Sequence, residues 1–419
     1  MQLGMPRLHT LRMIGRDPAE IHRVSTPLEL LFDLTFVVAF GTAASELVHG
    51  VVGGHLGPAL GGFCFAVFAV SWAWINFTWF ASAYDTDDWL HRLTTMFQMG
   101  GALIFALGLP AMFASLYRGE ALDIRVMVLG YVVMRVALIS QWWRASRHDP
   151  GRRRSHLTYI VSIGASQILW CVLAALQLPI GPAFVLLAVP FLFEIAGPFV
   201  AERHRGGTPW HPHHVAERYG LMVLIALGEG MLGTMANLTA VVRDGIGLEL
   251  GLLVFAGTAL TFGLWWMYFV LPHGEMLSAW RRRSFAWGYG HIPLFGAIVA
   301  IGAGLDISGA YLEGEGGLTL LGAFLAVAIP LGVFLVLFYL LYSVFTLSVD
   351  PFHLVLLLGS ALIVAAGTVL AGIGVGLSWD LALLALTPWV TVVGYETVGR
   401  RHNAALLQRT AAAASAPAG

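Results

Sequence analysis

The chain has 419 residues, of which 58% are hydrophobic and 11% are charged, and its mean hydropathy is +0.77. These values lie far from those of soluble proteins and exclude an ordinary globular enzyme or binding domain, so they indicate a polytopic membrane protein. A formal net charge of -1 and the absence of a nucleic-acid-binding motif argue against a nucleic-acid partner.

The chain is expected to consist of membrane-spanning helices between two cytoplasmic ends. Residues 1–27 contain no cleavable signal pattern, so the first helix is expected to be retained. Arginines gather in alternate loops, and this pattern places both termini in the cytoplasm of a bacterial cell, with residues 399–419 as a disordered tail. Apolar windows of about 20 residues predict about twelve helices, near 28–50, 59–82, 94–117, 122–143, 157–177, 181–200, 215–240, 248–271, 287–307, 317–344, 354–375 and 379–398.

Two features recur along the chain and indicate an internal duplication. Glu29 opens the first helix as Glu217 opens the seventh, and the aromatic segment that begins at Trp74 recurs at Trp266. The predicted fold is therefore an all-α integral membrane protein of two parallel six-helix repeats, like transporters with a site at the repeat interface. The expected segments are 1–27, a first half 28–200, a cytoplasmic linker 201–214, a second half 215–398 and the tail.

The first candidate site lies at the start of the first helix. Glu29 and Asp33 are four residues apart and share one helix face, which Phe36 and Phe40 continue. Such a face is expected to point into the helix bundle. Glu29 alone also suits a structural role at the positive end of the helix, whereas Asp33, one turn deeper, favours a functional role.

The second candidate site surrounds the start of the seventh helix. His213 and His214 lie four and three residues before Glu217, a spacing that can bring imidazole and carboxylate to one metal ion. No second motif supplies a further ligand, so no metal is expected. The favoured interpretation is an interfacial ion pair of Glu217 with Arg218, beside exposed loop histidines.

The most informative residue is Glu229, about 18 Å beyond Glu217 along the same helix. An ionisable group at this depth is costly and tends to mark a pathway or a ligand site. Neighbouring glycines would let another backbone or a ligand approach closely. Arg135, deep in the fourth helix, is the expected charge partner of Glu229. Glu194 and His291 are the other unusual polar residues; a lone membrane histidine usually has a structural hydrogen bond, and the alternative is that it takes or gives protons near neutral pH.

These residues resemble the bacterial low-temperature-requirement protein A family of multi-pass membrane proteins. The resemblance rests on residues 29–37, 214–229 and 289–293, with Leu31 and Tyr219 where the family pattern usually has phenylalanine. It implies a multi-pass membrane fold and the importance of these segments. It implies no settled substrate, reaction or cofactor.

Two functions follow from these residues, and a non-catalytic scaffold fits less well. The favoured function is a transporter, with coupling to protons as one form of it, in which Glu229 and Asp33 bind the proton or the substrate. The alternative is a membrane enzyme that performs acid/base chemistry on a lipid-soluble substrate such as an isoprenoid. Either function needs no cofactor, and the sequence leaves the oligomeric state open. The candidate acids are Glu229, Asp33, Glu29 and Glu217, and the candidate substrate-binding residues are Arg135, Arg218, His214, His291, Phe36, Phe40, Trp74, Trp266 and Tyr268.

Overall fold

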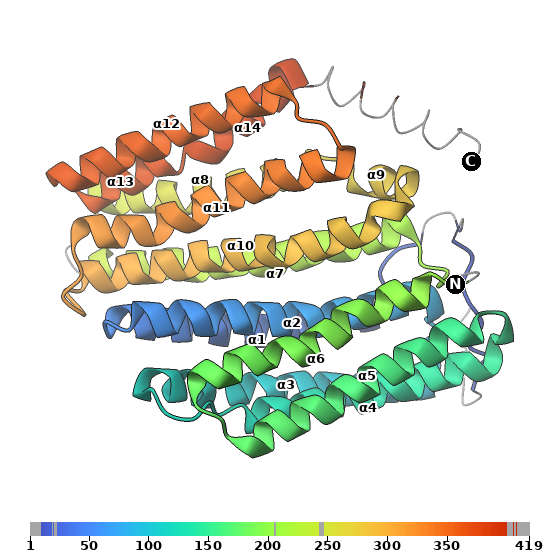
Figure 1. The fold of residues 1–419 in the computed structure, drawn as a ribbon. Coiled ribbons are helices and arrows are strands. Elements are labelled where there is room, and N and C mark those ends of the chain that lie inside the picture. Colours follow the sequence, from blue (N-terminus) through green and yellow to red (C-terminus); the bar gives the residue numbers. More distant parts are fainter. Residues whose placement is uncertain are drawn as a thin grey trace. The chain divides into compact units, whose positions relative to one another are not determined.

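The computed structural model describes residues 10–18, 20, 23–204, 207–242, 247–399, 405 and 408, and these residues form helices and no strand (Figure 1). The α-helices are α1 (Pro27–Val52), α2 (Leu56–Tyr84), α3 (Trp89–Arg118), α4 (Arg125–His148), α5 (Arg153–Leu176), α6 (Ile180–Glu202), α7 (Pro212–Val242), α8 (Leu248–Phe269), α9 (His273–Ala279), α10 (Ser284–Leu312), α11 (Leu320–Thr346), α12 (Pro351–Ile373), α13 (Leu377–Leu384) and α14 (Thr387–Gly394). Three short helical segments complete the set: η1 (Pro150–Arg152), η2 (Arg281–Arg283) and η3 (Tyr395–Gly399).

Twelve segments of the described chain are long and apolar enough to cross a membrane, which confirms the predicted all-α class and the predicted number of spans. Two spans are less regular than the sequence predicts. The eighth continues beyond α8 into the short helix α9, and the twelfth consists of α13, α14 and η3. Pro388 lies in the first turn of α14, where its ring cannot donate the backbone hydrogen bond that would continue α13.

Polar residues fix where several helices begin. The Asp88 side chain accepts a hydrogen bond from the backbone N–H of His91 at 2.9 Å, so α3 begins at Trp89, five residues before the predicted position. Asp350 caps α12 in the same way, and Pro351 follows it at the first helical position. Capping side chains therefore extend the helices beyond their apolar windows.

The chain divides into two compact units, which are described separately. The first unit comprises Met1–Thr42 and Ala69–Arg218, and the second comprises Ala43–Phe68 and Tyr219–Gly419. In the first unit α3 packs on α4, α4 on α5 and α5 on α6 (Figure 1). In the second unit α10 packs on α11, α11 on α12, and α8 on α13 and α14. Because α1, α2 and α7 each contribute residues to both units, the units differ from the predicted halves, and the repeat relation stays a prediction.

Candidate functional site

The start of α1 is a capping box in the first unit. The Thr26 backbone N–H donates to Glu29 Oε2 at 2.7 Å, and the Glu29 backbone N–H donates to Thr26 Oγ1 at 3.3 Å. This reciprocal arrangement satisfies two backbone donors that a helix start leaves free. Glu29 thus has the structural role that the sequence suggested for it.

Glu29 is also the centre of a buried ion-pair cluster that joins the two predicted motifs. Its Oε1 lies 3.1 Å from Arg218 Nη1 and 3.1 Å from His214 Nε2, and both partners come from α7. His214 and Arg218 are four residues apart, so they share one face of α7. All three side chains are fully buried. The buried cluster therefore combines the acid of the first motif with the bases of the second.

Asp33 extends this cluster by one turn of α1. Arg218 donates to both Asp33 oxygens, from Nε at 3.1 Å and from Nη2, and forms the two-pronged contact that suits a guanidinium and a carboxylate. Trp74 Nε1 donates to Asp33 Oδ1 at 2.7 Å. The Arg218 guanidinium lies 5.8 Å from the centre of the Trp74 ring. Arg218 therefore balances the charge of the Asp33 carboxylate, and Arg218 and Trp74 together fix its position.

The cluster reaches further, through residues that the sequence analysis missed. Arg23 lies 3.8 Å from Glu29 and 3.5 Å from Asp85, and Asp85 lies 3.5 Å from His91 and 4.0 Å from Arg16. Arg23 and Asp85 stand outside the spanning helices, where charged residues look like ordinary loop residues. The cluster contains two buried arginines and three buried carboxylates: Arg23, Arg218, Glu29, Asp33 and Asp85.

The prediction of an interfacial ion pair between Glu217 and Arg218 is wrong, because the Arg218 side chain is buried and pairs with the acids of α1. Glu217 is exposed, and its carboxylate accepts from the backbone N–H of Ser25 at 3.3 Å. Of the loop histidines expected to be exposed, only His213 is; His211 and His214 are buried. Since α7 begins at Pro212, His214 and Arg218 fall on its inner face. Within the described ranges, no group of three or more His, Cys, Asp or Glu side chains could hold a metal ion.

A second buried ion pair of the first unit involves Arg135, for which the sequence favoured Glu229 as the partner. The structure instead pairs Arg135 Nη2 with Glu194 Oε2 at 2.9 Å. Glu194 also accepts hydrogen bonds from four other side chains on α2, α4 and α5. These donors are Trp72 and Tyr131, with Ser166 Oγ at 2.9 Å and Trp170 Nε1 at 3.1 Å. This carboxylate is saturated, which suits a structural role.

Glu229 has different surroundings, in the second unit. It is 5% exposed on α7, where that helix packs closely on α10. A β-carbon added to Gly302 of α10 would lie 2.7 Å from the β-carbon of Glu229, so glycine is required at this contact. Asp306, an acid of α10, lies close to this part of α7: a β-carbon added to Gly233, one turn after Glu229, would lie 3.1 Å from the backbone nitrogen of Asp306. Among the residues that the structure describes, neither carboxyl group has an ion-pair partner. The sequence analysis missed Asp306 because it seemed to lie at a helix end.

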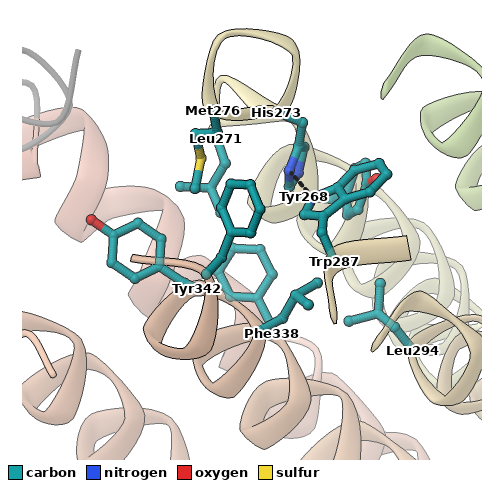
Figure 2. Close-up of a pocket in the computed structure, with 10 residues that line it drawn as sticks. Tyr268, Leu271, His273, Met276, Trp287, Leu294, Phe338 and Tyr342 are labelled. Carbon is teal, nitrogen blue, oxygen red and sulfur yellow. Dashed lines mark hydrogen bonds between the residues drawn. The ribbon is translucent and has the colours of Figure 1, made fainter. Parts of the chain in front are cut away.

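His291, a further candidate, is a fully buried residue of α10 with both ring nitrogens engaged. Its Nε2 lies 3.1 Å from the Tyr268 hydroxyl, and its Nδ1 lies 2.7 Å from the Trp287 carbonyl oxygen. These contacts are the structural hydrogen bonds expected of a lone membrane histidine. Beside them lies the pocket of Figure 2, where Trp287 Nε1 donates to His273 Nδ1 at 3.4 Å.

The aromatic candidates are divided between the two units. Phe36 and Phe40 are buried core residues of the first unit, and Trp74 is engaged with Asp33 there. In the second unit, Trp266 Nε1 donates to Glu396 at 3.2 Å. Tyr268 is the one member of this group that lines the pocket of Figure 2.

Comparisons with known proteins agree with this membrane-spanning architecture. The model of a family described as bacterial low temperature requirement A protein (LtrA) matches residues 24–388. An uncharacterized protein, RA0937, of Rhizobium meliloti (strain 1021) is 28% identical over 324 residues, which cover 72% of this chain and 73% of that protein. The family match includes Glu29, Asp33, His214 and Arg218 of the buried ion-pair cluster, and it also includes Glu229 and Asp306.

Proposed function

The chain belongs to the bacterial low temperature requirement A family, and on that premise we propose that it is a proton-coupled transporter of a small molecule. We place it in the bacterial inner membrane with both termini in the cytoplasm, as the arginine-rich loops indicate. The observation that supports the proposal is that the acids Glu229 and Asp306 lie where α7 packs closely on α10 and have no basic partner among the described residues.

Electrostatics explain why such a pair suits a proton site. One ionised carboxyl group at the centre of a spanning helix costs about 3 kcal/mol. Two ionised carboxyl groups also repel each other, and here no arginine offsets that repulsion. The pair is therefore most stable when it holds a proton, and it can release that proton when a counter-charge arrives. Reversible binding of this kind is what coupling to a proton gradient requires.

Two features of the second unit support the proposal that the protein changes conformation during transport. Gly228, Gly230 and Gly233 surround Glu229, and each lowers the helix propensity of α7 by about 1 kcal/mol relative to alanine. The twelfth span is interrupted between α13 and α14. Interrupted spanning helices are typical of transporters.

The proposal is tested with purified protein in liposomes that enclose a pH-sensitive dye. A panel of solutes is added outside under an imposed pH gradient, and proton movement is followed. We expect at least one solute to drive proton movement through the unsubstituted protein and Glu229→Gln to slow it at least tenfold. Glu217→Gln, at an exposed carboxylate, is the matched control and should retain the rate. A folded, reconstituted protein that moves no proton with any solute would contradict the proposal.

A second candidate is an enzyme that acts on a lipid-soluble substrate such as an isoprenoid, and the aromatic residues around the pocket of Figure 2 suit it; the pocket as it stands has room for about one water molecule, so this function requires it to widen. Its walls include Tyr268, Trp287 and Phe338, and aromatic faces stabilise cations. His273 in the same pocket could exchange a proton with a bound molecule. Metabolite profiles of cells and medium separate the two functions when cells with the unsubstituted protein are compared with cells that lack the protein and with cells that carry His273→Ala. A covalent product made only by the unsubstituted protein supports the enzyme, whereas one compound redistributed between cells and medium supports the transporter.

A further inference from the structure

Two sets of exposed arginines in the first unit differ in their partners. In one set each arginine forms an ion pair, at 2.8 to 3.0 Å, with an acid close by in the chain: Arg92 with Asp87, Arg118 with Glu120 and Arg125 with Asp123. The other set is exposed as well, but it has no carboxylate partner among the described residues: Arg147, Arg153, Arg154 and Arg203. The described part of the chain therefore leaves these four positive charges unbalanced.

The four unbalanced arginines lie at one end of the first unit. Helix α5 packs on both α4 and α6 (Figure 1). The short segment η1 joins α4 to α5, so Arg147 and Arg154 lie on either side of one tight connection. His204 follows Arg203 in the chain, and its Nε2 lies 3.0 Å from Thr158 Oγ1. Thr158 Oγ1 in turn donates to the Arg154 carbonyl oxygen at 2.9 Å, so the end of α6 lies beside the start of α5.

An apolar stripe runs along each of these helices from the arginine end. Its members are exposed and recur every seven residues, which is about two helical turns and keeps them on one face. The stripes consist of Leu129, Val136 and Trp143 on α4, Val161 and Ile168 on α5, and Val185, Leu192 and Phe199 on α6. Each stripe continues, after four or seven residues, into Arg147, Arg154 or Arg203. One face of each helix therefore has a charged end and an apolar length.

Trp143 marks the level of the arginines relative to the membrane. The Arg147 guanidinium lies 4.8 Å from the centre of the Trp143 ring, and both side chains are exposed. Tryptophan is enriched where the acyl region of a bilayer meets the headgroups, so an arginine stacked on it lies at the level of the lipid phosphates. Orientation in the membrane needs only positive charge in a loop. It does not explain why the arginines share faces with the apolar stripes.

We infer that this end of α4, α5 and α6 binds anionic phospholipid, with the lipid phosphate at the arginines and the acyl chains along the stripes. Guanidinium groups form paired, charge-assisted hydrogen bonds with phosphate. Basic clusters at the ends of spanning helices attract anionic headgroups. A soluble phosphate or a nucleic acid matches the charged end but not the apolar stripes, whereas a phospholipid matches both. The inference goes beyond the proposed transport and does not depend on it.

The experiment measures the binding of radioactive phospholipid to the purified protein in detergent. Phosphatidylglycerol and phosphatidylcholine with identical acyl chains are compared at one ionic strength, and we expect phosphatidylglycerol to bind at least tenfold more tightly. A variant that combines Arg147→Gln, Arg154→Gln and Arg203→Gln should lose this preference, whereas lysine at the same three positions should keep it. The matched control combines Arg92→Gln, Arg118→Gln and Arg125→Gln, which removes as many positive charges and should also keep the preference. Size-exclusion chromatography confirms that each variant is folded.

Salt and a soluble competitor test the inference without any substitution. Raising NaCl from about 0.1 M to about 1 M screens exposed charges and should weaken the binding of phosphatidylglycerol. Glycerol phosphate, which has the phosphate but no acyl chain, should not displace the lipid at equal concentration. Equal binding of the two lipids by the unsubstituted protein, or the same loss of preference in the control variant, would overturn the inference. Displacement by glycerol phosphate would also overturn it and would indicate a site for soluble anions.

Discussion

The acids of the first unit and those of the second differ in what surrounds them. Glu29 and Asp33 share Arg218, and Glu194 has Arg135 together with four further hydrogen-bond donors. Glu229 and Asp306 have no basic partner among the described residues. Both groups lie on spanning helices, so depth alone does not reveal the role of an acid.

The difference separates acids that stabilise the fold from acids that are available for binding. A buried carboxylate with a bidentate arginine is locked, because losing either partner leaves an isolated charge. A carboxyl pair without a basic partner can change its protonation at lower cost to the fold. Four substitutions or conditions test this distinction.

The largest effect is expected from Arg218→Met, which leaves Glu29 and Asp33 without their shared cation. The free energy of unfolding should fall by about 3 to 5 kcal/mol, because the two carboxylates stay buried. Chemical unfolding in detergent measures the change. Arg92→Met is the control, since Arg92 and Asp87 form an exposed pair worth about 0 to 1 kcal/mol. Equal losses in the two variants would refute the special role of the buried cluster.

Glu194→Gln should have a smaller but clear effect. The glutamine oxygen can still accept hydrogen bonds, but Arg135 loses its counter-charge, so the free energy of unfolding should fall by about 2 to 3 kcal/mol. The double variant with Arg135→Met measures the coupling. If the two residues act as a pair, the double variant should lose less than the sum of the single losses. Additive losses would show that each residue acts alone.

Glu229→Gln should leave stability nearly unchanged, within about 0.5 kcal/mol, or slightly raised. The substitution removes a carboxyl group that has no ion-pair partner among the described residues, so no favourable ion pair is lost. The same unfolding measurement gives the answer. A loss as large as that of Glu194→Gln would mean that Glu229 is a structural residue. It would contradict the distinction between the acids of the two units.

The smallest effect concerns acid sensitivity at Asp88, which lies outside the spanning helices. Burial raises the pKa of Asp88, but hydrogen bonds from Arg144 and from the backbone N–H groups of His91 and Leu11 outweigh it and lower the pKa to about 2. A carboxyl group whose pKa is lower in the folded than in the unfolded protein stabilises the fold at pH values above the pKa of the unfolded chain, about 4. That stability is lost as the pH falls toward 2. Unfolding temperatures from pH 5 to pH 2 should therefore decline less steeply in Asp88→Asn. An identical decline would contradict this assignment.

The fold was largely accessible from the sequence, and so was part of the candidate site. Apolar windows predict the spans because each must bury about 20 residues in lipid. The pairing of Arg218 with Asp33 was not predictable, since 185 residues separate them and each had a plausible local role. Proximity along the chain favoured Glu217 as the partner of Arg218, but the helix phase directs the two side chains to different faces.

The residues that the sequence analysis missed share a reason. Asp85 and Arg23 lie just outside the spanning helices, where charged residues are common and carry no signal. Asp306 falls within a helix but near its predicted end, where an acid is inexpensive. The break at Pro388 was visible in the sequence, yet a proline in an apolar window does not reveal whether the helix kinks or stops.

The distance along the chain between Asp33 and Arg218 also has a consequence for how the protein is made. Ribosomes add roughly 5 to 20 residues per second, so the first span waits about 10 to 40 s for its arginine to be synthesised. During that interval the first span carries two acids whose final counter-charge does not yet exist. Slowing translation between residues 42 and 212 should therefore increase the fraction of nascent chains in which the first span is not yet inserted.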